Sequence, residues 1–148
     1  MKVYLAVPDG WVYRSTGEGD ETTYEVTPAG PEFKKAPEAR FRLTVKKIKP
    51  EDVISRARGF VHAVVTRASE PPPIQENTVS VVRTFATVAH YAPALSGAQR
   101  LYVAASASAN TSTGTLYTIR FDIPEAEWQA VWERGEFLFA GMRLDDEF

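Results

Sequence analysis

Cysteine is absent from this chain of 148 residues, and histidine occurs only twice. Without cysteine, the chain can form no disulfide, no thiolate nucleophile and no cysteine-based zinc site. Neither His62 nor His90 has a carboxylate or a second histidine at the spacing of a metal-binding motif. We therefore expect structural or surface roles for both histidines, and we expect no catalytic residues, no bound metal and no cofactor.

Long apolar runs are also missing, so the sequence predicts no helix that spans a membrane. The first residues pass from a short apolar segment into Pro8-Asp9-Gly10, and they lack the apolar core and the cleavage site of a signal peptide. A cytoplasmic location is the simplest interpretation. A chain from which a signal sequence had been removed would show the same pattern.

The chain also lacks an excess of positive charge. Its 17 basic and 19 acidic residues leave a formal net charge of −2. Binding to nucleic acid or to an anionic membrane requires a concentrated basic field, so we expect neither partner. The glycines form no phosphate-binding loop and no dinucleotide-binding fingerprint, and no serine lies in a Gly-x-Ser-x-Gly elbow. The sequence therefore indicates neither nucleotide binding nor serine-hydrolase chemistry.

The clearest element that is present is a strand from Arg40 to Ile48. Phe41, Leu43 and Val45 alternate there with charged and polar residues, which is typical of a strand with one buried and one solvated face. Other strands are predicted where β-branched and aromatic residues gather. They cover 2–7, 22–27, 77–91, 100–108 and 115–123. We expect 77–91 to be one long strand, bent or bulged, and 15–21 to be a hairpin loop.

Two amphipathic helices are predicted. The first begins at Pro50, where two acidic residues follow and complement the helix dipole, and it continues for about five turns. Its apolar face comprises Ile54, Ala57, Val61, Val64 and Ala68. The second helix begins near Pro124, with Asp122 as a candidate cap. Gly135 either ends this helix or lets it press closely on the sheet.

The predicted order is three strands, a helix, three or four strands and a second helix. This order indicates the α+β class, with an antiparallel sheet and two helices packed against it. The length is ordinary for one domain, and no internal repeat divides the chain, so we expect a single domain over residues 1–148.

Three segments of the chain resemble the PsbP-like fold family. They are the opening Val7-Pro8-Asp9-Gly10-Trp11, the aromatic strand-to-helix passage Tyr117 to Trp132, and the closing Phe139-Ala140-Gly141-Met142-Arg143-Leu144. The resemblance implies a PsbP-like α/β sandwich, as in the Mog-type and small bacterial relatives. It also implies mostly non-enzymatic work: docking on a larger assembly, binding a partner protein, or chaperoning a hydrophobic segment. No functional residue of the family lies in a motif that this sequence matches, so the resemblance assigns a role to no residue of this chain.

Basic residues gather along the strand that starts at Arg40 and in the loop before it. They are Lys34, Lys35, Arg40, Arg42, Lys46 and Lys47. Such a cluster can simply be the solvated face of a sheet. The more specific interpretation is a docking surface for an acidic protein partner. Trp11 and Tyr13 join the candidates for partner binding, because tryptophan and tyrosine are enriched at interfaces.

The sequence thus favours a non-catalytic protein that binds another protein as an adaptor or assembly factor. One alternative is a small-ligand-binding or enzymatic α+β cone, although such chains typically begin with helices and hold an Asp/His pair in a pocket. A third hypothesis is a cytosolic chaperone for hydrophobic segments of secreted effectors. That hypothesis predicts an exposed apolar groove larger than the patches of ordinary monomers.

Overall fold

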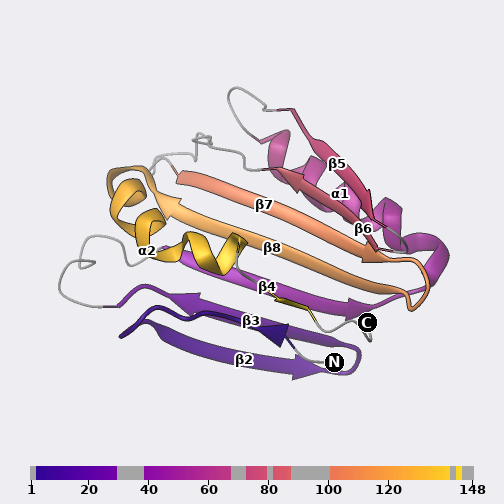
Figure 1. Ribbon diagram of the computed structural model, residues 1–148, viewed down its shortest axis with the longest axis horizontal. Helices are drawn as coiled ribbons and strands as arrows, with labels where there is room; N and C mark the ends of the chain where they lie inside the picture. Colours follow the sequence, from indigo (N-terminus) through magenta and orange to yellow (C-terminus); the bar gives the residue numbers. More distant parts are fainter. Residues whose placement is uncertain are drawn as a thin grey trace.

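The computed structural model describes residues 3–29, 39–67, 73–79, 82–87, 101–140 and 143–144 (Figure 1). The strands are β1 (Val3–Tyr4), β2 (Val12–Glu18), β3 (Glu21–Thr27), β4 (Arg40–Lys47), β5 (Gln75–Val79), β6 (Val82–Thr87), β7 (Leu101–Asn110), β8 (Thr115–Pro124) and β9 (Arg143–Leu144). The helices are α1 (Val53–Val65) and α2 (Trp128–Ala140), preceded by the single 3-10 turns η2 (Pro50–Asp52) and η3 (Glu125–Glu127).

Seven of the strands form one sheet in the order β2-β3-β4-β8-β7-β6-β5. Each neighbouring pair in this sheet is antiparallel. β1 and β9 pair with each other in a separate two-stranded sheet. The predicted α+β class, with an antiparallel sheet and two helices, is therefore confirmed.

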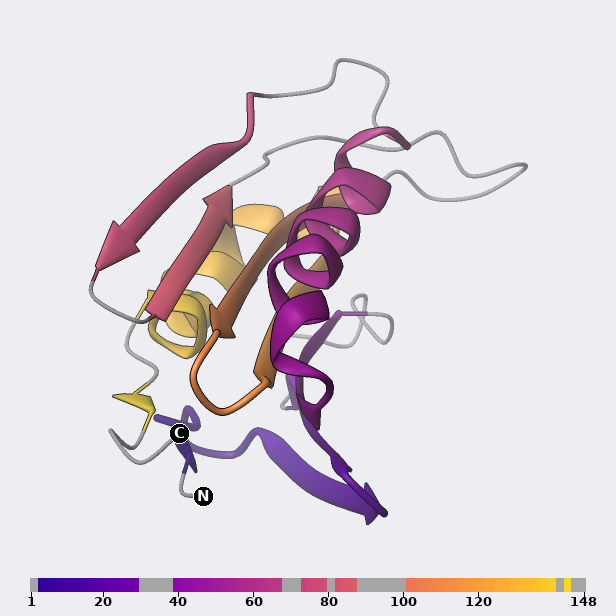
Figure 2. The same ribbon diagram turned by 90° about the vertical axis from the view of Figure 1, so that its right-hand side faces the viewer.

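The two helices lie on opposite faces of the sheet, as Figure 2 shows. α1 packs on β6, β7 and β8, and α2 packs on β8. Side chains alternate between the faces of a strand, so the central strands bury side chains on both sides. On β7, Ala105, Ala107 and Ala109 face α1 and are fully or almost fully buried beneath it. These small side chains let the helix lie close to the sheet.

The amphipathic pattern of α1 is largely confirmed. Its buried residues are Val53, Ala57, Val61, Val64 and Val65, which form one face. Ile54 is only partly buried, because Val53 takes the position against the sheet, and Ala68 lies outside the described residues. The helical segment begins at Pro50 as predicted, although its first turn is the 3-10 turn η2, and the α-helix covers only Val53–Val65 and is shorter than five turns.

The core under α2 joins both ends of the chain. It comprises buried Trp11, Val26, Phe41, Leu43, Val45, Tyr117, Ile119, Phe121, Ile123, Val131 and Leu138 with smaller neighbours. Phe41 and Phe121 meet edge to face, with ring centroids 5.8 Å apart. The alternation predicted for β4 is confirmed, because Phe41, Leu43 and Val45 are all buried in this core.

Gly135 lets α2 press closely on the sheet, and the helix continues through it. A Cβ atom at this position would lie 2.8 Å from two ring atoms of Phe121 and 2.9 Å from Cη2 of Trp11. A turn in which the Trp11 amide donates to the carbonyl of Pro8 brings this tryptophan into the core. Gly10 has a φ of 81° in that turn, as a glycine at the third turn position allows.

Two strand predictions were wrong. The polar segment 15–21 is mostly strand, because β2 extends to Glu18 and only Gly19 and Asp20 form the turn into β3. The segment 77–91 is not one bent strand, since β5 and β6 pair antiparallel with Val79 opposite Val82. The remaining part of that segment, from 88 to 91, lies outside the described residues.

The predicted cap of the second helix was also wrong. Pro124 occupies the N-terminal cap position of η3, and it makes no side-chain hydrogen bond there. Asp122 instead lies within β8, where its Oδ1 accepts a hydrogen bond from Nε of Arg120 at 2.7 Å. This charge pairing along the strand draws the carboxylate away from the start of the helix.

Candidate functional site

On the side of the sheet that carries α1, one part of the sheet is not covered by a helix of the described residues. The helix covers the β6-β7-β8 side, and the register of the strands then places charged and hydroxyl side chains of β2, β3, β4 and β8 on the same face. We name this surface the arginine face. It comprises Arg14, Thr16, Thr23, Glu25, Arg40, Arg42, Thr44, Thr118, Arg120 and Asp122.

A row of charged residues crosses the arginine face from strand to strand. Arg14 pairs with Glu25, Glu25 with Arg42, and Arg42 with Arg120. The row ends at β7, where Ala105 lies opposite Arg120 beneath α1. Four neighbouring strands therefore present three guanidinium groups and one carboxylate in a single line.

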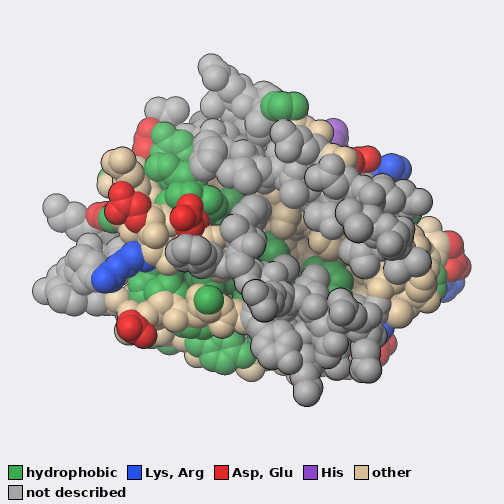
Figure 3. Space-filling model, in the orientation of Figure 1, with side chains coloured by type: hydrophobic (Ala, Val, Ile, Leu, Met, Phe, Trp, Pro, Cys, Tyr) green, Lys and Arg blue, Asp and Glu red, His purple; other side chains and the backbone are tan. Residues whose placement is uncertain are grey.

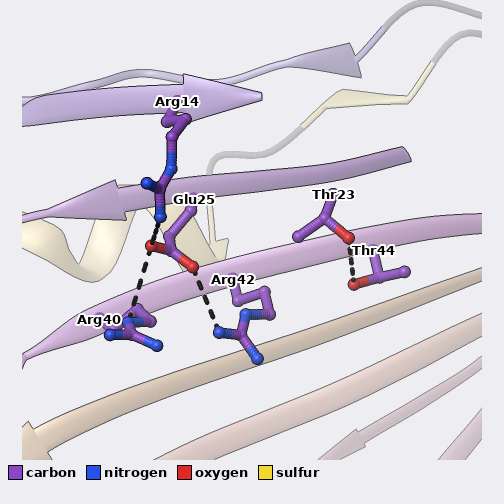
Figure 4. A network of polar contacts seen from close by, with 6 residues as sticks. All are labelled: Arg14, Thr23, Glu25, Arg40, Arg42 and Thr44. Atoms are coloured by element: carbon purple, nitrogen blue, oxygen red, sulfur yellow. Dashed lines mark hydrogen bonds and ion pairs between the residues drawn. The ribbon is translucent and has the colours of Figure 1, made fainter. Parts of the chain in front are cut away.

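Glu25 is the centre of the charge network, which Figure 4 shows from close by. Nη2 of Arg14 donates to Oε1 of Glu25 at 2.9 Å, and Nη2 of Arg42 donates to Oε2 at 3.2 Å. Nε of Arg40 lies 3.7 Å from Oε1 in a third ion pair. The Glu25 side chain is only 14% exposed, whereas those of Arg14, Arg40 and Arg42 are 70%, 48% and 48% exposed. The carboxylate lies low between the strands, and the guanidinium groups reach outward over it.

The three arginines lower the pKa of Glu25. Burial favours the neutral acid and opposes this change, but hydrogen bonds from Arg42 and Arg14 and the positive charges of Arg40 and Arg42 outweigh it. The pKa of Glu25 therefore lies below its ordinary value of 4.5. At neutral pH the carboxylate is ionised, and it fixes the three guanidinium groups above the sheet.

A row of threonines runs beside the charged row. Thr16 pairs with Thr23, Thr23 with Thr44, and Thr44 with Thr118. The Oγ1 atoms of Thr23 and Thr44 lie 3.3 Å apart and share a hydrogen bond. Neighbouring strands are about 4.8 Å apart, so the row forms a regular line of hydroxyl groups across four strands.

Positive charge exceeds negative charge on the arginine face. At its centre four arginines face two carboxylates, those of Glu25 and Asp122, while Glu18, Glu21 and Lys46 lie on the same side toward the β2-β3 turn. Arg42 and Arg120 lie directly opposite each other, and like charges in such a cross-strand position oppose sheet formation. A threonine or an acidic residue in place of either arginine would avoid this repulsion, yet the sheet carries arginine at both positions.

Two hollows border the threonine row. One, of about 410 Å³, lies between the sheet and α1 and is lined by residues that include Lys46, Arg56 and Thr118. The other, of about 380 Å³, lies at the β2-β3 end and is lined by residues that include Thr16 and Glu21. Nζ of Lys46 and Oε2 of Glu21 are joined by an ion pair of 3.2 Å between the hollows. The surface is therefore ridged and open, without an enclosed pocket among these residues.

The opposite face of the sheet, around α2, presents a stack of aromatic rings. The rings of Trp128 and Trp132 are stacked with their centroids 4.8 Å apart, Tyr102 lies 4.9 Å from Trp128, and Phe121 lies 6.0 Å from Trp132. Trp128, Trp132 and Tyr102 are partly exposed. On this side of the molecule, exposed hydrophobic side chains lie next to acidic side chains (Figure 3).

The structure brings three of the predicted site residues together. Arg40, Arg42 and Lys46 share the α1 side of β4, with Lys46 at the edge of the arginine face. Lys47 has the opposite orientation on the strand, and its Nζ donates to Oγ1 of Thr115 at 2.6 Å. Lys34 and Lys35 lie outside the described residues.

The two aromatic candidates are not part of this surface. Trp11 is 7% exposed and belongs to the core against α2. Tyr13 is 49% exposed, and it lies on β2 opposite Val26, whose side chain faces the α2 core. Arg40, Arg42 and Lys46 thus lie on the opposite face of the sheet from Trp11 and Tyr13.

Arg14, Glu25 and Arg120 are site residues that sequence reasoning missed. They lie on three different strands, and only the register of the sheet brings them beside Arg42. One signal was present. Gly-Asp is a frequent two-residue hairpin turn, and a turn at Gly19-Asp20 places Arg14 opposite Glu25 by counting back along both strands.

Among the described residues, no three His, Cys, Asp or Glu side chains gather so that they could hold a metal ion. His62 is exposed on α1, and His90 lies outside the described ranges. No helix in the described part of the chain combines the length and the apolar character needed to cross a membrane.

No known protein family matches this chain in its sequence profile, and no curated protein matches its sequence. The resemblance to the PsbP-like family stays a prediction that rests on the three segments quoted above.

Proposed function

We propose that this protein is a non-catalytic binding module that docks an acidic segment of a partner protein on the arginine face. The observation that carries the proposal is the pairing of Arg42 with Arg120 across β4 and β8, within a surface where four arginines meet two carboxylates. A carboxylate placed over this pair would relieve the repulsion between the two guanidinium groups.

Arginine suits this role because its planar guanidinium group can donate two parallel hydrogen bonds to one carboxylate. Glu25 fixes three of the guanidinium groups in place, which lowers the entropy that they lose when a partner binds. The threonine row beside them offers both donors and acceptors to the backbone of an extended segment. Charge and hydroxyl rows together favour an extended acidic peptide.

The chemistry of the arginine face supports binding over catalysis. Guanidinium groups do not give up protons near neutral pH, and threonine hydroxyls need a base to act as nucleophiles. Glu25, with its lowered pKa and its three arginine partners, is a weak base. The PsbP-like resemblance, through the docking role that it implies, supports the same proposal.

Fluorescence anisotropy with a labelled oligoglutamate peptide tests the proposal. We expect saturable binding that weakens as salt is added, and an oligolysine peptide serves as the ligand control. The double variant Arg42→Gln/Arg120→Gln should weaken binding by at least about tenfold, because each charged hydrogen bond contributes about 1.5 to 3 kcal/mol. The matched control is Arg67→Gln, which removes an exposed arginine from the turn after α1. Equal losses in both variants would contradict the proposal.

The chaperone hypothesis is the second candidate, and the partly exposed stack of Tyr102, Trp128 and Trp132 favours it. An extended apolar peptide labelled at one end should then bind on the α2 side. Tyr102→Ser should weaken such binding and leave oligoglutamate binding unchanged. Apolar peptide binding that Tyr102→Ser leaves intact would contradict this candidate.

A further inference from the structure

β2 is an edge of the seven-stranded sheet, and in the described part of the chain it carries few of the features that protect such edges. All seven of its residues are exposed. It contains no proline, and its seven residues pair with β3 one to one without a bulge. Native edge strands are usually short, bulged, covered or broken by proline, because an open edge pairs readily with another strand.

The backbone groups that β2 directs outward follow from its turn. Glu18 and Glu21 flank a two-residue turn, so they exchange both of their backbone hydrogen bonds. Alternation along the strand then directs the N–H and C=O groups of Tyr13, Ser15 and Gly17 toward the open edge.

We propose that two copies of this chain pair through β2, antiparallel, about a two-fold axis at Thr16. This register places Ser15 opposite Gly17 of the second copy, so that the outward backbone groups of each strand meet those of the other. It also places Arg14 opposite Glu18 of the second copy, and by symmetry this charge pair forms twice. All four charged side chains lie on the α1 side of the joined sheet.

The charges of β2 select this register over its neighbours. An axis at Ser15 places Arg14 opposite Thr16 and Glu18 opposite Val12, and it forms no charge pair. An axis at Arg14 places two arginines against each other. An axis at Gly17 pairs Glu18 with Thr16, and it places Arg14 beyond the end of the partner's β2, opposite Asp20 of the turn and outside the paired strands. Opposite charges in directly opposed cross-strand positions stabilise a sheet, and like charges destabilise it.

The paired sheet would extend the arginine face. Thr16 lies opposite Thr16 of the second copy, so the threonine row continues without a break from β8 of one copy to β8 of the other. Both arginine faces then point to the same side, because the two-fold axis is perpendicular to the sheet. A partner with two acidic segments would bind such a dimer more tightly than it binds one copy, through the higher effective concentration of the second site.

This inference is independent of the proposed function, since oligoglutamate binding to a monomer needs only one arginine face. Sedimentation velocity over a range of protein concentrations should show a monomer-dimer equilibrium for the natural chain. Ser15→Pro removes an outward N–H group and leaves the hydrogen bonds to β3 in place, so it should give a monomer with an unchanged circular dichroism spectrum. A natural chain that stays monomeric, or a Ser15→Pro variant that still dimerises, would overturn the proposal.

Charge exchange tests the register itself. Glu18→Arg alone places Arg14 against a second arginine, and Arg14→Glu alone places Glu18 against a second glutamate, so each variant should sediment as a monomer. An equimolar mixture of the two variants restores both opposite-charge pairs and should sediment as a heterodimer. Failure of the mixture to associate, or dimers of either variant by itself, would contradict pairing about Thr16.

Discussion

Arg42 on β4 and Arg120 on β8 lie directly opposite each other in the sheet, and both side chains stand on the face that α1 leaves open. Each has a carboxylate neighbour, Glu25 for Arg42 and Asp122 for Arg120. Arg42 reaches across to Glu25 on β3, and Arg120 bonds to Asp122 along its own strand β8. These carboxylates reduce the repulsion between the two arginines in the folded protein, and an acidic partner of the kind proposed would reduce it further.

Arg120→Gln should separate binding from stability. The substitution removes a like charge opposite Arg42 and also a partly exposed ion pair to Asp122, and these effects oppose each other. We expect the free energy of unfolding to change by less than about 0.5 kcal/mol, with weaker oligoglutamate binding in the anisotropy assay. Urea denaturation measures the first quantity. A large loss of stability with unaltered peptide affinity would show that Arg120 is structural.

Glu25→Gln should change the pH dependence of stability. The pKa of Glu25 is lowered in the folded protein, so its ionised form stabilises the fold fully above the ordinary value of 4.5. This contribution is lost as the pH falls from 4.5 through the lower folded value. The difference in unfolding free energy between the natural chain and Glu25→Gln should therefore be largest near neutral pH and should shrink below pH 4.5. A difference that stays constant with pH would contradict the charge network.

Gly135→Ala should destabilise the protein, although alanine is the better helix former. The new methyl group would meet the ring of Phe121 at 2.8 Å and Trp11 at 2.9 Å, which forces the helix from the sheet. Overpacking of this kind costs about 1 to 3 kcal/mol in urea denaturation. Gly59→Ala in α1 is the matched control, because nothing lies within 4 Å of its Cβ position, and it should gain about 0.5 to 1 kcal/mol. Equal effects of the two substitutions would contradict the close packing of α2.

Gly114→Ala should cost more than Gly19→Ala. Both glycines have positive φ angles, 70° and 59°, so alanine is strained at either position. At Gly114 the Cβ atom would also collide with the backbone carbonyl of Ile48, whereas at Gly19 nothing lies within 4 Å. The Gly19 variant should lose about 1 to 2 kcal/mol, and the Gly114 variant should lose more. A smaller loss at Gly114 would mean that the turn between β7 and β8 lies away from Ile48.

Much of the fold could be predicted where one face of an element is buried. The alternation from Phe41 to Val45 identified β4, and the apolar spacing from Ala57 to Val64 identified α1. β2 has all its residues exposed and therefore shows no apolar alternation, so its polar residues resembled a loop. β5 and β6 could not be told apart in the sequence, because no glycine, proline or asparagine stands between Val79 and Val82.

The candidate site was less predictable, because it depends on contacts between strands distant in sequence. Arg40 and Arg42 could be assigned to a polar face from alternation on a single strand. Glu25 and Arg120 can be placed beside them only when the order β3-β4-β8 is known. In the described residues, a helix and three strands separate β4 from β8 along the chain. The burial of Trp11 could not be predicted from its own segment, because the side chain packs against Gly135 on α2, far away in the sequence.

The most direct test of the central claim is a titration of the isotopically labelled protein with oligoglutamate, followed by the chemical shifts of its backbone amides. Docking on the arginine face predicts shift changes at Arg42, Thr44 and Arg120, with little change at Tyr102 or Trp128 on the α2 side. Shift changes confined to the α2 side, or no saturable change at Arg42 and Arg120, would contradict the account.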